Sequence, residues 1–108
     1  MVFTIVANLQ AKQEYIPAIK AKLIDASRVY QKDKGTIDWF VHQSRNDPSS
    51  FIIVERFEDE AGVKVHQENP YYKAFGLYVG PILAEPVRVQ QFNELDTSKA
   101  VQVPEQTW

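Results

Sequence analysis

Residues 35–57 read GTIDWFVHQSRNDPSSFIIVERF, and this stretch decides the fold. Over residues 37–43, successive side chains fall alternately on an apolar face and a more polar one. Residues 51–57 are mostly β-branched and aromatic, with Glu55 and Arg56 as the polar residues, and both runs are typical of β-strands. Between the two runs, Asn46, Asp47 and Pro48 are residue types that favour a turn. The stretch therefore predicts two antiparallel strands joined by a loop.

The segments before this hairpin predict a strand followed by a helix. Residues 2–10 are rich in β-branched side chains, whereas residues 13–32 carry apolar side chains at steps of three and four. Pro17 fits this helix only near its start, because the first-turn amides have no partner within the helix. Gly35 is expected to end the helix after Lys32 and Lys34, whose charges suit a helix C-terminus.

The segments after the hairpin predict a second helical region and a last strand. Asp59 is a suitable N-cap for a helix that runs to about residue 68. Pro70 disfavours helical geometry at Asn69, so the helix should break there and resume through residues 72–79. Residues 87–92 then supply a strand. The order strand, helix, strand, strand, helix, strand predicts an α+β, ferredoxin-like βαββαβ fold with an antiparallel sheet over residues 1–95.

The sheet face turned away from the helices is expected to be too apolar for water. We therefore predict that a second copy of the chain covers this face in a symmetric homodimer. Residues 96–108 are more polar and form a tail that is either flexible or packed on the partner through Val101, Val103 and Trp108. The apolar side chains on the face are Val2, Val6, Phe40, Ile52, Val54 and Phe92.

Composition excludes several classes of function. The chain of 108 residues has no cysteine and two histidines, which excludes disulfides and cysteine-based zinc sites and predicts no metal centre. Twelve basic and fourteen acidic residues leave no positive surplus for nucleic acid. No segment has the apolar length of a membrane span, and no targeting segment is present. We therefore expect a cytoplasmic protein that binds neither nucleic acid nor membrane.

His66 is the best candidate for acid–base chemistry. It lies on one helical stripe with Gly62, four residues earlier, and Asn69, three residues later. An imidazole is suited to accept a proton near neutral pH, and Asn69 is placed to orient it or a substrate. The alternative is a helix-end histidine that binds a carbonyl group or water. His42, on the face opposite Trp39, is interpreted as structural.

Asn8 and Glu55 are polar residues on otherwise apolar strands. A bulge near the end of the first strand would turn Asn8 inward, where its amide could donate a hydrogen bond to an oxyanion; otherwise it is an ordinary strand-end residue. Glu55 shares a face with apolar side chains and must be paired or protonated. We interpret it as one half of a structural salt bridge, with Arg28 or Arg88, rather than as a general base.

Aromatic residues are concentrated around the second helical region. They would shield and stack on a flat aromatic ligand, although such a stripe is also compatible with a simple hydrophobic core. The residues are Trp39, Tyr71, Tyr72, Phe75 and Tyr78.

Several segments, in this order and spacing, resemble the antibiotic biosynthesis monooxygenase (quinol monooxygenase) family of dimeric α+β barrel proteins. They are VANLQAKQE (residues 6–14), SRVYQKDKG (27–35), the strand that ends in Glu55, Arg56 and Phe57, then His66, and finally NPYYKAF (69–75). Many relatives have a second histidine where Tyr71 stands here. The haem-degrading members use a tryptophan and a histidine where this chain has His66 and Phe75, so the resemblance does not extend to haem binding.

The resemblance implies a homodimer that oxidises a small aromatic, phenolic or quinol substrate with dioxygen and without any cofactor. By position, it implies His66 as the base and Asn8 as the hydrogen-bond donor, with Asn69 as a further polar anchor. The expected walls of the substrate pocket are Trp39, Tyr71, Tyr72 and Phe75. The family also contains isomerases and members without a known reaction. A tautomerase and a non-catalytic ligand-binding dimer are therefore the alternative hypotheses.

Overall fold

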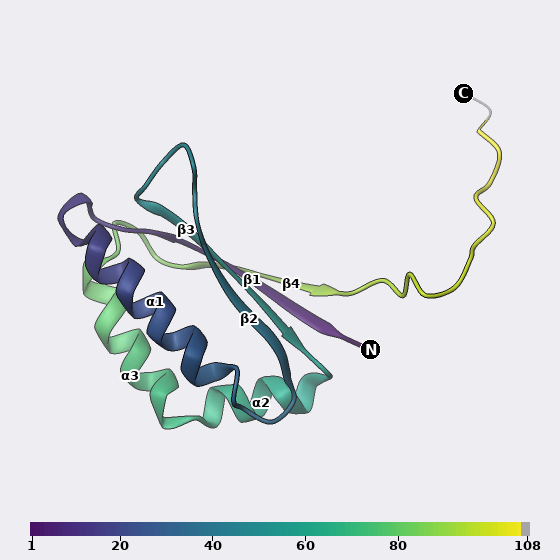
Figure 1. The fold of residues 1–108 in the computed structure, drawn as a ribbon, viewed down its shortest axis with the longest axis horizontal. Helices are drawn as coiled ribbons and strands as arrows, with labels where there is room; N and C mark the ends of the chain where they lie inside the picture. The colour runs from purple at the N-terminus through teal and green to yellow at the C-terminus, as the bar shows by residue number, and fades with distance from the viewer. Residues whose placement is uncertain (107–108) are drawn as a thin grey trace.

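A computed structural model describes residues 1–106, which form a four-stranded sheet in the order β2-β3-β1-β4 (Figure 1). The strands are β1 (Phe3–Gln10), β2 (Thr36–Gln43), β3 (Ser50–Phe57) and β4 (Arg88–Asn93). Every neighbouring pair is antiparallel. This arrangement is the predicted ferredoxin-like α+β fold.

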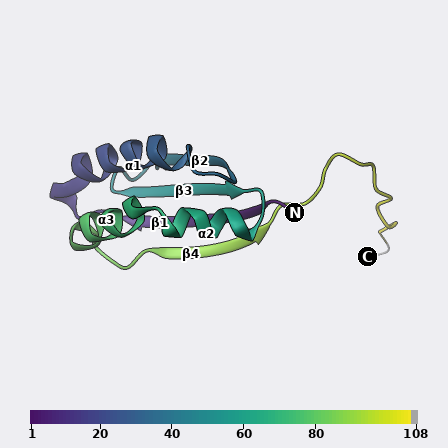
Figure 2. The ribbon, with the colours of Figure 1, turned by 90° about the horizontal axis from the view of Figure 1, so that it is seen from below.

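All helices lie on one face of the sheet (Figures 1 and 2). They are α1 (Ile16–Tyr30), α2 (Glu60–Glu68) and α3 (Pro70–Val79), with short 3-10 turns at Gln13–Tyr15 and Gly80–Ile82. The helix predicted over residues 13–32 is thus shorter, because a 3-10 turn precedes α1 and the helix ends at Tyr30. Among the described residues, no helix is both long enough and apolar enough to cross a membrane.

The predicted break between the second and third helices is confirmed. Asp59 caps α2, its side chain accepting a hydrogen bond from the amide of Gly62 at 3.3 Å. Asn69 adopts an extended ψ of 126° before Pro70 and accepts a hydrogen bond from the amide of Tyr71 at 3.0 Å. Because Pro70 fits the first position of a helix, α3 begins there rather than at Tyr72.

The hydrophobic core lies between the helices and the inner face of the sheet. Alternate residues of β1 and β3 point into it, and the side chains of α1 that face the sheet are also buried. The buried side chains of β1 are Ile5, Ala7 and Leu9, those of β3 are Phe51, Ile53, Glu55 and Phe57, and those of α1 are Ile19, Leu23, Ala26, Ser27 and Tyr30.

Asn8 lies on the other face of the sheet, which we call the outer face. Strand β1 pairs with β3 from Phe3 to Gln10 without a shift in register, and Asn8 is opposite Ile52. The bulge that would turn Asn8 inward is therefore absent from β1, and Asn8 is the ordinary strand residue of the alternative reading, on the face away from His66. Every residue of β1 is paired with a residue of β3, and Phe3–Asn8 are also paired with β4. This continuous pairing keeps successive side chains of β1 on alternate faces of the sheet.

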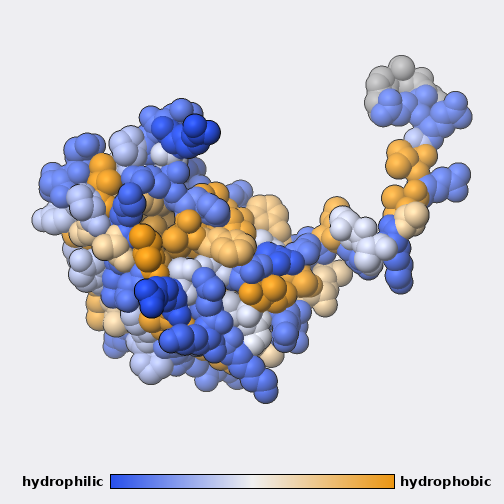
Figure 3. Space-filling model, in the orientation of Figure 1, coloured by the Kyte–Doolittle hydropathy of each residue, from blue (hydrophilic) through white to orange (hydrophobic). Residues whose placement is uncertain are grey.

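The segment after β4 contains no helix or strand over residues 94–106 and runs away from the body (Figure 1). Apolar side chains recur along it in Figure 3, and Val101 and Val103 are exposed. Its packing on a partner stays a prediction. Trp108, which was part of that prediction, lies outside the described residues.

Two glycines set the approach of α2 to the loop before β2. Gly35 has a φ of 86°, a left-handed conformation that glycine adopts without strain. A Cβ atom built on Gly62 would lie 2.8 Å from the carbonyl oxygen of Gly35, and that oxygen accepts a hydrogen bond from the amide of Glu58. Only a glycine at position 62 allows this contact, which places His66 one turn further along α2.

We predict that Gly62→Ala lowers the free energy of unfolding by about 1–3 kcal/mol, because the added methyl group would displace backbone atoms. Gly76→Ala is the matched control. Nothing lies within 4 Å of its Cβ position, so this helical site should gain about 0.5–1 kcal/mol. Urea denaturation measures both values, and equal stabilities of the two variants would contradict the close approach.

Candidate active site

A cavity of about 610 Å³ opens between the inner face of the sheet and α3. Its size is within the range of small-molecule sites. Strand β4 forms one side, because its inward residue Val89 is 56% exposed and no helix covers it. Glu55 and His66 are the titratable groups at the buried end, and the mouth carries Glu85. The remaining lining residues are Ala7, Leu9, Tyr30, Trp39, Ile53, Tyr72, Phe75, Gly76, Val79, Gly80, Leu83, Ala84, Pro86, Val87 and Val89.

His66 reaches the cavity from the last turn of α2 and is 4% exposed. Aromatic rings surround it on several sides. The Tyr30 ring meets it edge-on at 4.2 Å between centroids, and those of Tyr72 and Phe57 lie at 5.2 and 5.5 Å. Burial among these rings lowers the pKa of His66 from 6.5 to about 4. At neutral pH the imidazole is therefore uncharged.

Glu55 lies on β3, and its carboxylate oxygen Oε1 is 3.4 Å from Nε2 of His66. The residue is 6% exposed, and burial raises its pKa from 4.5 to about 7. The indole group of Trp39, directly opposite on β2, partly opposes this rise. The expected salt bridge to Arg28 or Arg88 is wrong, since Glu55 instead contacts His66 and Arg88 pairs with Asn8 on the outer face.

The second imidazole nitrogen of His66 faces Asp33. Its Nδ1 atom is 4.0 Å from Oδ2 of Asp33, too far for a hydrogen bond. Oδ1 of the same carboxylate accepts a hydrogen bond from the side chain of Asn69 at 2.8 Å. Asn69 thus caps α3 and holds Asp33 beside the imidazole, and it does not line the cavity. Its predicted contact with substrate is not present in this arrangement.

The structure brings together most, but not all, of the residues expected at the site. Trp39, Tyr72 and Phe75 line the cavity with His66. Tyr71 does not line it, because its hydroxyl group donates a hydrogen bond to Asp25 at 2.5 Å on the surface of α1.

Sequence reasoning missed two members of this site. Tyr30 falls within the apolar periodicity of residues 13–32, which indicates a core position, yet it lines the cavity and is 1% exposed. The role of Glu55 as the partner of His66 was also missed. A signal for that role was present, because a carboxylate at an inward strand position requires a polar partner.

Glu55 and His66 are in contact, and burial shifts the pKa of each in the direction that favours its neutral form. Burial disfavours both the carboxylate and the imidazolium, so between about pH 4 and pH 7 the folded pair holds one proton, on Glu55. Above about pH 7 the pair becomes a carboxylate next to a neutral imidazole. Such a unit is able to take up and return one proton close to neutral pH. Among residues 1–106, no group of three or more histidine, aspartate or glutamate side chains is arranged to hold a metal ion.

The fold and the site together define a class of small α+β proteins that have a buried acid–base pair at the end of an apolar cavity. The family model for antibiotic biosynthesis monooxygenases matches residues 2–76, well over half of the chain. The chain belongs to this monooxygenase-like family.

Solved structures share the fold. The protein Rv0793 of Mycobacterium tuberculosis superposes with a TM-score of 0.83 at 19% identity, covering 92% of this chain and 100% of that one. PA3566 of Pseudomonas aeruginosa gives 0.81 at 22% identity, with coverages of 88% and 95%. A Nitrosomonas europaea protein provisionally named antibiotic biosynthesis monooxygenase gives 0.85 at 18% identity, with coverages of 91% and 94%. A search among curated proteins found no match.

The shifted pKa values predict opposite pH dependences of stability for two variants. With both residues present, the folded and unfolded pairs each hold one proton between about pH 4.5 and 6.5, so the pair contributes no slope there. In Glu55→Gln, His66 is protonated only in the unfolded state over pH 4–6.5, so stability falls as pH decreases. In His66→Gln, Glu55 is protonated only in the folded state over pH 4.5–7, so stability falls as pH increases.

Urea denaturation across pH 4–7.5 measures how the free energy of unfolding of each variant depends on pH. The wild-type curve is subtracted to remove the contribution of the other carboxylates. The free energy of unfolding of each variant should change by about 1–3 kcal/mol across the pH range given for it. Parallel curves for the two variants would show that Glu55 and His66 titrate normally.

Proposed function

We propose that the protein is a cofactor-independent monooxygenase that oxidises a small phenolic or quinol-type substrate with dioxygen. The observation that carries this proposal is the contact of 3.4 Å between Glu55 and His66 at the buried end of the cavity. Membership of the monooxygenase-like family supports the same class of reaction.

The reaction begins with removal of a proton from the substrate by the Glu55–His66 pair. The resulting anion transfers one electron to dioxygen, giving a substrate radical and superoxide. These recombine to a peroxide, which takes back the proton from the pair and then loses water to leave a carbonyl group. One oxygen atom of dioxygen thus enters the product and the other leaves as water, with the substrate as the only reductant.

Each property of the cavity serves one step of this reaction. The pKa of Glu55, near 7, suits a base at neutral pH better than that of His66, near 4. The neutral imidazole of His66 beside it can accept the proton and pass it on. Trp39, Tyr72 and Phe75 surround a flat ring and exclude water from the reactive anion. Asn8 has no part in this mechanism because it lies on the outer face.

Oxygen uptake with a panel of hydroquinones and anthrones tests this activity. We expect consumption of one dioxygen per substrate by the wild type, and a loss of kcat of about a hundredfold or more in Glu55→Gln and in His66→Ala. His42→Ala, which removes the other histidine from the outer face of β2, should retain the activity. In the wild type, kcat/KM should rise with pH through about 7, because the pair must first lose its proton.

Unchanged turnover in both site variants would contradict the assigned role of the pair. Saturable binding without oxygen consumption by any substrate would favour a non-catalytic binding protein.

A proton-transferring isomerase is the second candidate, favoured by the same pair. A protonated Glu55 beside a neutral His66 offers one donor and one acceptor, as a keto–enol isomerisation requires. Activity on a keto substrate under anaerobic conditions would separate this function from the oxygenase.

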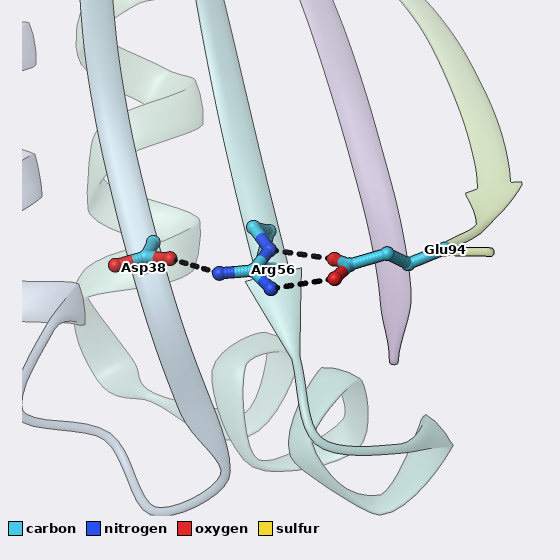
Figure 4. Close-up of polar contacts among 3 residues, drawn as sticks. All are labelled: Asp38, Arg56 and Glu94. Carbon is cyan, nitrogen blue, oxygen red and sulfur yellow. Dashed lines mark hydrogen bonds and ion pairs between the residues drawn. The ribbon is translucent and has the colours of Figure 1, made fainter. Parts of the chain in front are cut away.

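We also propose that a second copy of the chain covers the outer face. Phe40 and Phe92 are each 47% exposed on this face, with Phe40 opposite Val54 of β3 and Phe92 opposite Thr4 of β1. Arg56 on this face is already paired within the chain, because it donates hydrogen bonds to Asp38 at 2.5 Å and to Glu94 at 2.7 and 2.9 Å (Figure 4). An exposed apolar face whose Arg56 needs no carboxylate from a partner suits the self-contact of a symmetric dimer.

Light scattering coupled to gel filtration tests this assembly. We expect twice the mass of one chain for the wild type and a single-chain mass for Val54→Lys, which would bury an unpaired charge in the interface. Leu77→Lys, at an exposed apolar position of α3, should remain a dimer. A monomeric wild type would contradict the proposed interface.

A further inference from the structure

The buried end of the cavity contains two donors without a hydrogen bond of normal geometry among the described residues. They are the hydroxyl group of Tyr30 and the indole nitrogen of Trp39, and the second of these lies beside the Glu55 carboxyl group and lowers its pKa. Both side chains line the cavity, and they are 1% and 2% exposed. Buried polar atoms are nearly always hydrogen-bonded, so two such donors side by side require an explanation.

The two donors come from neighbouring elements and lie close to the acid–base pair. The rings of Tyr30 on α1 and Trp39 on β2 are 4.7 Å apart between centroids. Tyr30 also contacts His66 at 4.2 Å, and Trp39 is the cross-strand neighbour of Glu55. A ligand atom that reaches these donors would therefore also reach the pair.

Both groups stay donors at physiological pH. Burial, together with the nearby Tyr71 and Glu55, raises the pKa of Tyr30 well above its ordinary value, so it remains a phenol. An indole N–H donates and never accepts. The site therefore requires an acceptor from the ligand.

The cavity lining also limits the charge of the ligand. Among the described residues that line it, there is no lysine or arginine, while Glu55 and Glu85 are acidic. A carboxylate or phosphate would lose its hydration there without gaining a cation. The deep acceptor must belong to a neutral group, such as a phenol, enol or carbonyl.

We propose that Tyr30 and Trp39 form an oxygen-binding site that orients a neutral, apolar ligand with its single phenol, enol or carbonyl oxygen at the buried end of the cavity. The apolar body of the ligand then extends toward Phe75 and β4. This inference deepens the proposed function, since it places the substrate oxygen next to the pair that removes its proton. Tyr30 is a positioning residue for this oxygen.

The absence of a partner for the Tyr30 hydroxyl has a measurable consequence for stability. Removing an unsatisfied buried hydroxyl does not break a hydrogen bond, so Tyr30→Phe should have the same Tm as the wild type or a higher one. Tyr71→Phe is the matched control, because its hydroxyl group donates to Asp25 and lies off the cavity. Its Tm should fall.

Ligand binding tests the site directly. NMR titrations in air-free buffer compare 1-naphthol, naphthalene and 1-naphthoate, which share one ring system and differ in the oxygen group. We expect the wild type and Tyr71→Phe to bind 1-naphthol about tenfold more tightly than naphthalene, and 1-naphthoate most weakly. In Tyr30→Phe the preference for 1-naphthol should fall about threefold or more.

Several results would overturn this proposal. They are equal affinities of the wild type for 1-naphthol and naphthalene, no binding of either compound, full preference in Tyr30→Phe, or a Tm of Tyr30→Phe that falls as far as that of Tyr71→Phe. The oxygenase proposal can fail on its own: if the ligands bind as expected but no quinol leads to oxygen consumption, the binding site stands and the oxygenase activity does not.

Discussion

The contact between Glu55 and His66 is the constraint on which the rest of the site depends. Each residue alone would be destabilising at its position, since a buried carboxylate and a buried imidazolium both lose hydration. Burial keeps Glu55 protonated and His66 neutral between about pH 4 and pH 7, so the contacting pair carries no net charge in the core there. The fold therefore tolerates two titratable groups on an apolar surface, and their shifted pKa values suit proton transfer.

The geometry of this contact follows from the packing of backbone on backbone. Strand β3 fixes Glu55 between β1 and β2, and His66 can approach it only if α2 lies close to the sheet. The close contact of Gly62 with Gly35 permits that approach, and the break at Asn69 then turns the chain into α3. Asn69 also holds Asp33 on the far side of the imidazole. Local sequence features, rather than a large core, thus position the chemical groups.

Periodicity predicted the fold well because each strand and helix has one strongly apolar face. The strand pattern of residues 37–43 and 51–57, the cap at Asp59 and the effect of Pro70 all have local causes, and all are present in the structure. The site was predicted less completely, because it depends on contacts between distant elements. Tyr30 and Trp39 lie on a helix and a strand whose packing against each other is not specified by local periodicity, and the face on which Asn8 lies depended on a bulge that β1 lacks.

The protonation state of the Glu55–His66 pair is the property that most directly tests this account. NMR titration of the imidazole nitrogens of His66 and the side-chain carboxyl carbon of Glu55 measures both groups in the folded protein. The account predicts that His66 remains neutral down to about pH 4 and that Glu55 titrates near pH 7. Titration of His66 near 6.5 and of Glu55 near 4.5 would contradict it, because the two groups would then behave as solvated side chains.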